Sequence, residues 1–156
     1  MHIEPRSYRL FAEGLEIVLE RSGEGASELH LDVIPTHRNG LGILHGGAVF
    51  SLVDTGMALA LMSLFEPGES CVTVEVKVNN IAPVREGRIV ARSVVAHRGR
   101  TLAHVESTVT HGEGKLVAKA LGTFFVRGER SELGRPRGEL GGPRAEQGRS
   151  GPAPAS

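Results

Sequence analysis

The segment from Gly46 to Phe65 constrains the fold most, because it is predicted to be a helix with apolar side chains in every direction. A polar loop over residues 36–44 precedes it, and Pro67 and Gly68 end it. The apolar side chains cover all angles of a 3.6-residue period: Val49, Phe50, Leu52, Val53, Met57, Leu59, Leu61, Met62, Leu64 and Phe65. A globular protein accommodates such a helix only when other structure surrounds it. We therefore expect this helix at the centre of the fold.

The rest of the chain supplies strands that can surround the helix. Residues 72–78 alternate between valine and polar side chains, which predicts a strand with its valines on one buried face and Thr73 on the opposite face. Residues 88–97, 101–110 and 116–126 are rich in β-formers and are joined by short turns that contain glycine, so they are expected to pair as an antiparallel meander.

Before the helix, two further strands are expected at residues 15–20 and 28–34, around a turn at Gly23 and Gly25. A short helix over residues 6–13 precedes them and is closed by Gly14. The sum is one long central helix wrapped by a curved antiparallel sheet of five or six strands, an α+β fold.

Composition changes after Arg127. From residue 128 to residue 156 the chain holds mainly Gly, Pro, Arg, Glu and Ser, without aromatic side chains, Ile or Val. Such a segment buries too little apolar surface to offset the entropy of ordering it. We expect one folded domain within residues 1–127, ordered from about residue 5, and a disordered tail at 128–156.

Charge and cysteine content exclude several classes of function. Eighteen Lys and Arg balance eighteen Asp and Glu, so the chain lacks the positive field that binds nucleic acid or an anionic membrane. Neither a membrane-spanning segment nor a signal peptide is visible, so a cytoplasmic protein is expected. Cys71 is the only cysteine and is expected to be a small buried side chain. The seven histidines show no H-E-x-x-H or comparable spacing, so no metal site is expected.

Two adjacent glycines, Gly46 and Gly47, lie where the loop meets the helix. The first amides of a helix have no intrahelical acceptor and lie at the positive end of its dipole, so glycines there can let an oxyanion approach. The alternative is that these glycines only permit a tight turn beneath the sheet. Gly40-Leu41-Gly42 does not continue into a dinucleotide-binding motif, because His45 stands where the third glycine is needed.

Asp54 is the most informative single residue, because aspartate is unfavourable within a helix and costly among apolar neighbours. Catalysis as general base or nucleophile would explain it; the alternative is a carboxylate satisfied by a neighbouring side chain or water. Eight residues at about 1.5 Å each separate Asp54 from Gly46 by roughly 12 Å, too far to act on one carbonyl. If both are catalytic, two subunits related by a two-fold axis share each site.

The motif formed by Asn39, His45-Gly46-Gly47 and Asp54, with Phe50-Ser51-Leu52-Val53 between them, resembles the hotdog-fold acyl-CoA thioesterases of the phenylacetate-degradation (PaaI-like) type. The resemblance continues through residues 73–78, the Ala82-Pro83 turn and the hairpin at 98–101 to Val126. It implies a hotdog fold that hydrolyses acyl-CoA without a metal or a Ser or Cys nucleophile, and without a cofactor, since coenzyme A is part of the substrate.

The same resemblance implies roles for individual residues. The backbone N–H of Gly46 would polarise the thioester carbonyl with help from the Asn39 side chain. Asp54 of the partner subunit would activate water or attack directly. His45 would lie near the sulfur, or alternatively orient the loop. Thr73 stands where a related group of these enzymes holds the attacking water with a Ser or Thr.

Substrate binding is expected at Gly47 and at the hairpin Arg98-Gly99-Arg100, whose guanidinium groups could pair with the phosphates of coenzyme A or could be ordinary solvated charges. The resemblance also implies a homo-oligomer, at least a dimer and commonly a tetramer, and an aromatic or medium-chain acyl group. The alternatives are a non-catalytic acyl-CoA-binding hotdog protein and a hydroxyacyl-CoA dehydratase; the position of Asp54 favours hydrolysis over dehydration.

Overall fold

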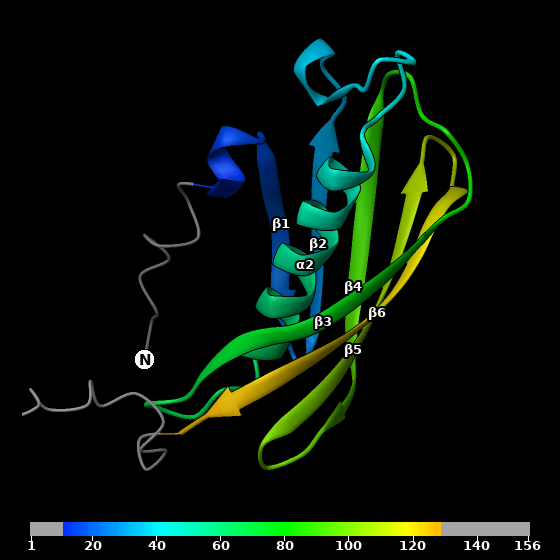
Figure 1. The fold of residues 1–156 in the computed structure, drawn as a ribbon. Helices are drawn as coiled ribbons and strands as arrows, with labels where there is room; N and C mark the ends of the chain where they lie inside the picture. Colours follow the sequence, from blue (N-terminus) through cyan, green and yellow to red (C-terminus); the bar gives the residue numbers. More distant parts are fainter. Residues whose placement is uncertain (1–10, 129–156) are drawn as a thin grey trace, which may run out of the picture.

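The computed structural model describes residues 11–128, which form one six-stranded antiparallel sheet and a long helix (Figure 1). In chain order the elements are β1 (Ile17–Gly23), β2 (Ala26–Asp32), a 3-10 turn (Pro35–His37), α2 (Gly46–Met62), β3 (Ser70–Asn80), β4 (Arg88–Arg98), β5 (Leu102–His111) and β6 (Lys115–Arg127). The predicted α+β fold with a central helix and a curved sheet is confirmed. Residues 11–14 are helical, whereas the earlier part of the predicted 6–13 helix and the predicted tail from residue 129 onward lie outside the described residues.

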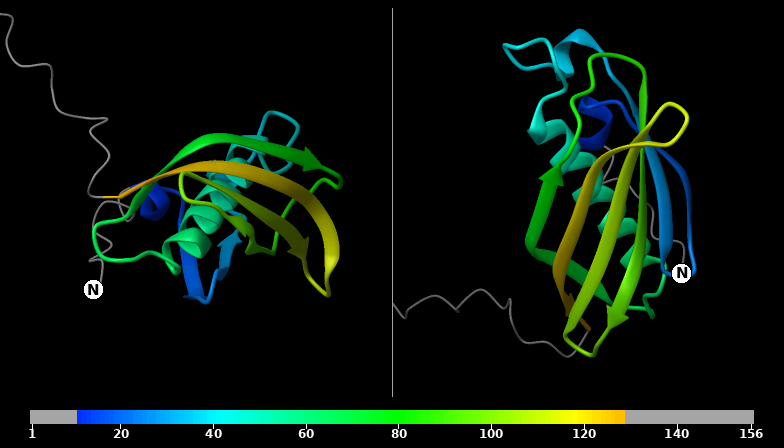
Figure 2. Two further views of the ribbon diagram at one scale, coloured as in Figure 1. Left: turned by 90° about the horizontal axis from the view of Figure 1, so that it is seen from below. Right: turned by 90° about the vertical axis from the view of Figure 1, so that its right-hand side faces the viewer.

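The sheet curves around α2, as the view from below in Figure 2 shows. The helix packs onto the concave face, where Leu52, Val53, Met57 and Leu61 are fully buried. Burial of such side chains contributes roughly 1.5–3 kcal/mol each. The sheet does not surround the helix completely, since Phe50 remains 42% exposed. The side of the helix that carries Phe50 is therefore left uncovered by residues 11–128.

The helix ends at Met62, three residues before the predicted end at Phe65. The reason is Ser63, whose hydroxyl donates to the carbonyl of Ala60 at 2.7 Å and accepts the amide of Gly25 at 2.8 Å. Gly25 belongs to the β1–β2 turn, where Glu24 and Gly25 both have positive φ. This turn geometry matches the twist of a two-residue hairpin. Ser63 thus ties the end of α2 to the first hairpin.

Strand order in the sheet is β1-β2-β4-β5-β6-β3. The predicted meander β4–β5–β6 is confirmed. After α2 the chain forms β3 at the far edge, where it pairs antiparallel with β6, as Figure 1 and Figure 2 show. Because β3 has a neighbour on one side only within residues 11–128, its other edge is open in the part of the chain that the structure describes.

The regular alternation predicted for β3 is wrong in its first half. The pairing with β6 slips between Thr73 and Glu75, so Val74 is the extra residue of a β-bulge. Val72 and Val74 are 52% and 59% exposed, whereas Val76 and Val78 pack against the core. The bulge reverses the pattern, and Thr73 is on the helix-facing side instead of opposite the buried valines.

Two features are absent from residues 11–128. No helix there is long and apolar enough to cross a membrane. Within the same range, no group of three His, Cys, Asp or Glu side chains is arranged to hold a metal ion.

Candidate active site

The start of α2 presents one backbone amide that has no acceptor among the described residues. His45 is the N-cap in extended conformation, and its Nδ1 accepts the amide of Gly47 at 2.8 Å. Because Nδ1 accepts, the neutral ring carries its proton on Nε2. The next amide, that of Ala48, donates to the carbonyl of His45 at 3.0 Å. Only the amide of Gly46 finds no acceptor within residues 11–128.

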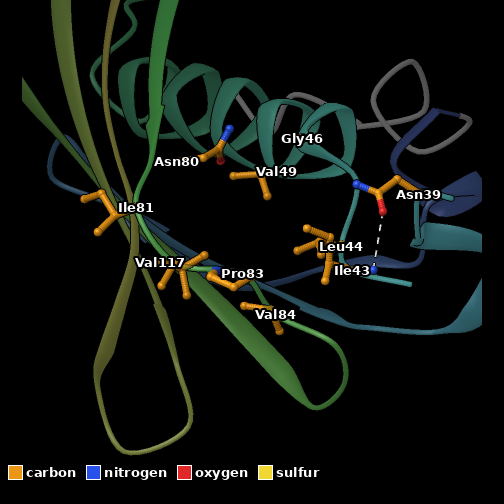
Figure 3. Close-up of a pocket in the computed structure, with 11 residues that line it drawn as sticks. Asn39, Ile43, Leu44, Gly46, Val49, Asn80, Ile81, Pro83, Val84 and Val117 are labelled. Atoms are coloured by element: carbon orange, nitrogen blue, oxygen red, sulfur yellow. Dashed lines mark hydrogen bonds between the residues drawn. The ribbon is translucent and has the colours of Figure 1, made fainter. Parts of the chain in front are cut away.

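The loop before the helix fixes the orientation of Asn39. Its Oδ1 accepts the amides of Leu41 at 2.9 Å and Ile43 at 3.4 Å. These contacts hold the side chain in an Asx turn, which is typical of Asn in tight loops. Figure 3 shows the consequence: the oxygen is directed at Ile43, and the nitrogen lies on the side of the helix start. Asn39 therefore offers a fixed N–H donor near Gly46.

A cavity of about 340 Å³ lies against this helix start. Asn39, Gly46 and Asn80 are its polar lining residues, and the others are apolar: Ile43, Leu44, Val49, Ile81, Ala82, Pro83, Val84 and Val117. Figure 3 shows these side chains around one hollow between α2, the end of β3 and β6. The cavity combines an apolar wall with hydrogen-bond donors at one end, as small-molecule sites commonly do.

Asp54 lies two turns further along α2 and is half-buried. Its Oδ1 accepts the hydroxyl of Thr73 at 2.9 Å. The two residues line a second cavity, of about 290 Å³, together with Phe11, Ala12, Thr55, Ala58, Cys71 and Val72. The open edge of β3 is thus where the carboxylate becomes accessible.

Cys71 shares this second cavity with Asp54. Burial of the thiol and, to a smaller extent, the negative charge of Asp54 raise the pKa of Cys71 to about 11. A thiol with such a pKa is almost entirely protonated at neutral pH and is a poor nucleophile.

The two cavities share no lining residue. One holds the free amide of Gly46 and the side chain of Asn39, and the other holds the carboxylate of Asp54. Eight helical residues place Gly46 and Asp54 roughly 12 Å apart along the axis of α2. Within one chain, these groups cannot contact the same carbonyl carbon.

The remaining predicted site residues lie elsewhere. The amide of Gly47 is bound to His45, and a side chain there would approach Nδ1 within 2.9 Å, so this glycine serves the helix cap. Arg98 forms a half-buried ion pair with Glu69 at 2.6 Å, which lowers the pKa of the Glu69 carboxyl. Gly99 donates to the carbonyl of Leu102 at the hairpin turn. Arg100 is exposed, and none of these four residues lines either cavity.

Two residues with an evident place in the site were missed in the sequence. Asn80 lines the first cavity, and the signal for it was available: two-residue steps from Val76 and Val78 place an amide on the helix-facing side. Phe11 lines the cavity of Asp54. No local pattern indicated Phe11, because its position depends on how the first helical turn packs against α2.

The sequence is similar to that of known thioesterases. The family model of the thioesterase superfamily matches residues 41–118, half of the chain. Human acyl-coenzyme A thioesterase 13 is 32% identical over 106 residues, which cover 67% of this chain and 75% of the human protein. The chain spans only 56% and 60% of the length of two curated relatives from Saccharolobus solfataricus.

Two solved structures extend the similarity to the fold. A hypothetical thioesterase protein from Streptococcus pneumoniae, crystallised with coenzyme A, superposes with a TM-score of 0.74 at 28% identity and covers 81% of this chain and 99% of its own. A mutant of the phenylacetic acid degradation protein PaaI from Thermus thermophilus gives a TM-score of 0.68 at 29% identity, with 74% and 96% coverage. With the family match, the fold and the helix-start motif in agreement, this chain belongs to the thioesterase superfamily and has its hotdog fold.

Proposed function

We propose that the protein hydrolyses acyl-CoA thioesters to a free acid and coenzyme A, at sites shared between two subunits. The observation that carries this proposal is the division of one catalytic set between two separate cavities: a free helix N-terminal amide beside Asn39 in one, and Asp54 hydrogen-bonded by Thr73 in the other. The family membership and the names of relatives that act on acyl-CoA support the same class of reaction.

The first cavity supplies electrophilic assistance. The thioester carbonyl oxygen would accept the N–H of Gly46 and the amino group of Asn39. Both donors are held in place before the substrate arrives, one by the helix and the other by the Asx turn. Donors that need no reorganisation stabilise the negative charge that develops on this oxygen in the transition state.

The second cavity supplies the attacking group. In the general-base route, the partner's Asp54 takes a proton from water while the water oxygen bonds to the carbonyl carbon and the carbonyl π electrons move to oxygen. When the carbonyl re-forms, the C–S bond breaks and the electron pair leaves with the thiolate, which then takes up a proton. The Nε2–H of His45 is a donor that could stabilise the thiolate. The hydroxyl of Thr73 orients the carboxylate.

A second copy of the chain brings the two halves together if the helices are apposed in antiparallel fashion. The open edge of β3 and the uncovered side of α2 support this arrangement. Val72 is 52% exposed and borders the cavity of Asp54, and Phe50 is 42% exposed one turn before Asp54. Exposed apolar side chains gathered next to a half-site are typical of a surface that pairs with another subunit.

The acyl group is expected to occupy the apolar part of the first cavity. A volume of about 340 Å³ admits an aromatic or medium-chain acyl group, which is the substrate class we propose. The similarity to a phenylacetic acid degradation protein favours testing aromatic thioesters first.

The decisive experiment measures thiol release from phenylacetyl-, hydroxybenzoyl-, short-chain and medium-chain CoA. We expect turnover by the wild type and a loss of at least about 100-fold in Asp54→Asn. Asp32→Asn is the matched control, because Asp32 is an exposed carboxylate paired with Arg88. Binding of the thioesters without turnover would instead establish the non-catalytic binding protein, and full activity of Asp54→Asn would contradict the assigned role of Asp54.

The shared site has its own test. Gly46→Pro removes the free N–H, and proline is well tolerated at the first position of a helix; Gly46→Ala keeps the N–H and controls for the added carbon. Gly46→Pro and Asp54→Asn should each be inactive alone. When the two are co-expressed, half of a random dimer population is mixed, and each mixed dimer has one intact site. We expect about a quarter of wild-type activity. No recovery in purified mixed dimers, or an active monomer in sedimentation, would contradict the shared site.

A further inference from the structure

Asn80, the last residue of β3, places an amide where the strand pattern otherwise places valine. From the bulge onward, Val76 and Val78 face α2, and the next residue in this row is Asn80. Its backbone is fixed, because Asn80 pairs with Ala118 of β6 and the next amide donates to Val117 at 2.8 Å. The direction of the Asn80 side chain is therefore a property of the sheet.

This amide lies against the start of the helix. A Cβ added to Gly46 would be 3.5 Å from Nδ2 of Asn80, in ordinary contact. Figure 3 shows the Asn80 side chain beside Val49, directed towards α2, in the cavity that Gly46 and Asn39 also line. Within residues 11–128, neither atom of the Asn80 amide has a hydrogen-bond partner.

An acyl group that fills this cavity would remove water from the Asn80 amide. An amide that is buried without a partner loses its hydrogen bonds to water, which is unfavourable, and the surrounding wall is apolar. The carbonyl oxygen of a thioester bound at Gly46 would lie in the cavity that Asn39 and Asn80 also line, and so would be the nearest acceptor for these donors. In the tetrahedral intermediate this oxygen is an anion with three lone pairs, so a third donor can be accommodated beside Gly46 and Asn39.

We propose that Asn80 is a further catalytic residue, whose Nδ2–H donates a hydrogen bond to the carbonyl oxygen of the thioester. This inference rests on the proposed thioesterase function. No proton is transferred: as water adds to the carbonyl carbon, the π electrons of the C=O bond move to oxygen, and the amide stabilises the resulting charge until the C–S bond breaks.

The kinetic test compares Asn80→Ala with Asn80→Asp. Asn80→Ala removes the donor, and we expect kcat to fall about 10-fold or more, with KM changed less than about 3-fold, for every acyl chain that the wild type hydrolyses. Asn80→Asp places a carboxylate beside the developing oxyanion, so its kcat should fall further than that of Asn80→Ala. Asn79→Ala and Asn79→Asp, one residue earlier on the opposite face of β3, are the matched controls and should keep wild-type kcat.

A binding measurement tests the same contact without turnover. Calorimetry would compare a CoA thioether that carries a ketone next to the S–CH2 group with the plain alkyl thioether of the same length. Asn80→Ala should weaken binding of the ketone compound by about 5-fold or more, as expected for the loss of one hydrogen bond. The affinity for the alkyl thioether should stay unchanged. Thermal unfolding of each variant checks that the fold is retained.

The outcomes separate this inference from the proposed function. A wild type without activity on any thioester would overturn the function, while the ketone comparison would still report on Asn80. An active wild type with unchanged kcat in Asn80→Ala would overturn the role of Asn80 alone. A loss confined to KM, or to certain acyl chains, would also overturn it, because Asn80 would then select the acyl group instead of stabilising the oxyanion.

Discussion

The hydroxyl of Thr73 on β3 donates a hydrogen bond of 2.9 Å to Oδ1 of Asp54 on α2, across a separation of 19 residues. The bulge at Val74 makes this contact possible, because it places Thr73 on the side of the sheet that faces the helix. Thr73 thereby restricts the rotation of a half-buried carboxylate, and the second oxygen, Oδ2, has no partner among the described residues and can bind water.

Replacement of Thr73 by valine keeps the shape of the side chain and removes the hydroxyl. We expect kcat for thiol release to fall about 10-fold, since an oriented base contributes part of a general-base effect of about 100- to 10,000-fold. Thr73→Ser should retain most of the activity. In an Asp54→Asn background, Thr73→Val should cause no further loss, because the residue acts through the carboxylate. Additive losses in the double variant would contradict this coupling.

His45 has two separable roles, one in the helix cap and one at the thiol. Asparagine is a good N-cap but lacks the Nε2–H of histidine, so His45→Asn should keep the free energy of unfolding within about 0.5 kcal/mol of wild type, whereas His45→Ala should lose about 1 kcal/mol. Both variants should lose activity if Nε2–H assists the leaving thiolate. Urea unfolding and thiol release on the same samples measure the two effects. If His45→Asn turns over at the wild-type rate, His45 acts only as the N-cap of the helix and does not assist the leaving thiolate.

Much of the fold could be predicted from the sequence because its signals are local. The uninterrupted apolar helix, the valine-rich strands and the glycine turns each identify an element, and the meander follows from short connections. The position of β3 at the sheet edge, next to β6, has no such signal. Neither has the bulge at Val74, since an extra residue in one strand is defined by its pairing partner.

The candidate site shows the same division. The N–H of Gly46 and the separation from Asp54 follow from helix geometry, so the two half-sites could be anticipated. The hydrogen bond from Thr73 to Asp54 could not be anticipated, because the Thr73 side chain faces the helix only as a result of the bulge. Arg98 was a candidate for binding the phosphates of coenzyme A, with an ordinary solvated charge as the alternative. Its pairing with Glu69 depends on how the β4–β5 hairpin packs against the segment after α2.

Cys71 should be alkylated slowly and with a steep dependence on pH. With a pKa of about 11 its thiolate is about 0.1% of the total at pH 8, and the rate should increase about tenfold per pH unit until pH 11. Asp54→Asn removes a negative charge next to the thiol, so its alkylation should be faster at every pH below 11. Mass spectrometry after timed exposure to iodoacetamide measures the rates, with the unfolded protein in urea as reference. A plateau below pH 9 would contradict the raised pKa.

The ion pair between Arg98 and Glu69 indicates that Arg98, in the β4–β5 hairpin, stabilises the fold and does not bind substrate. Both side chains are partly buried, and the guanidinium lowers the pKa of the Glu69 carboxyl. Arg98→Ala should therefore reduce the free energy of unfolding by about 1 kcal/mol at neutral pH. A carboxyl whose pKa is lowered in the folded state stabilises the fold above its unfolded pKa, and this stabilisation disappears as the pH falls through the folded value.

The difference between wild type and Arg98→Ala should accordingly be constant near neutrality and vanish in acid below the pKa of Glu69. Since its guanidinium is already paired, Arg98 should contribute little to coenzyme A binding, and KM for acyl-CoA should change less than about 2-fold in Arg98→Ala. Arg100 is exposed and unpaired among the described residues, so Arg100→Ala should leave stability unchanged and raise KM if the hairpin contacts the phosphates. Matched urea titrations and KM measurements on both variants decide between the two arginines, and a raised KM in Arg98→Ala alone would reverse this assignment.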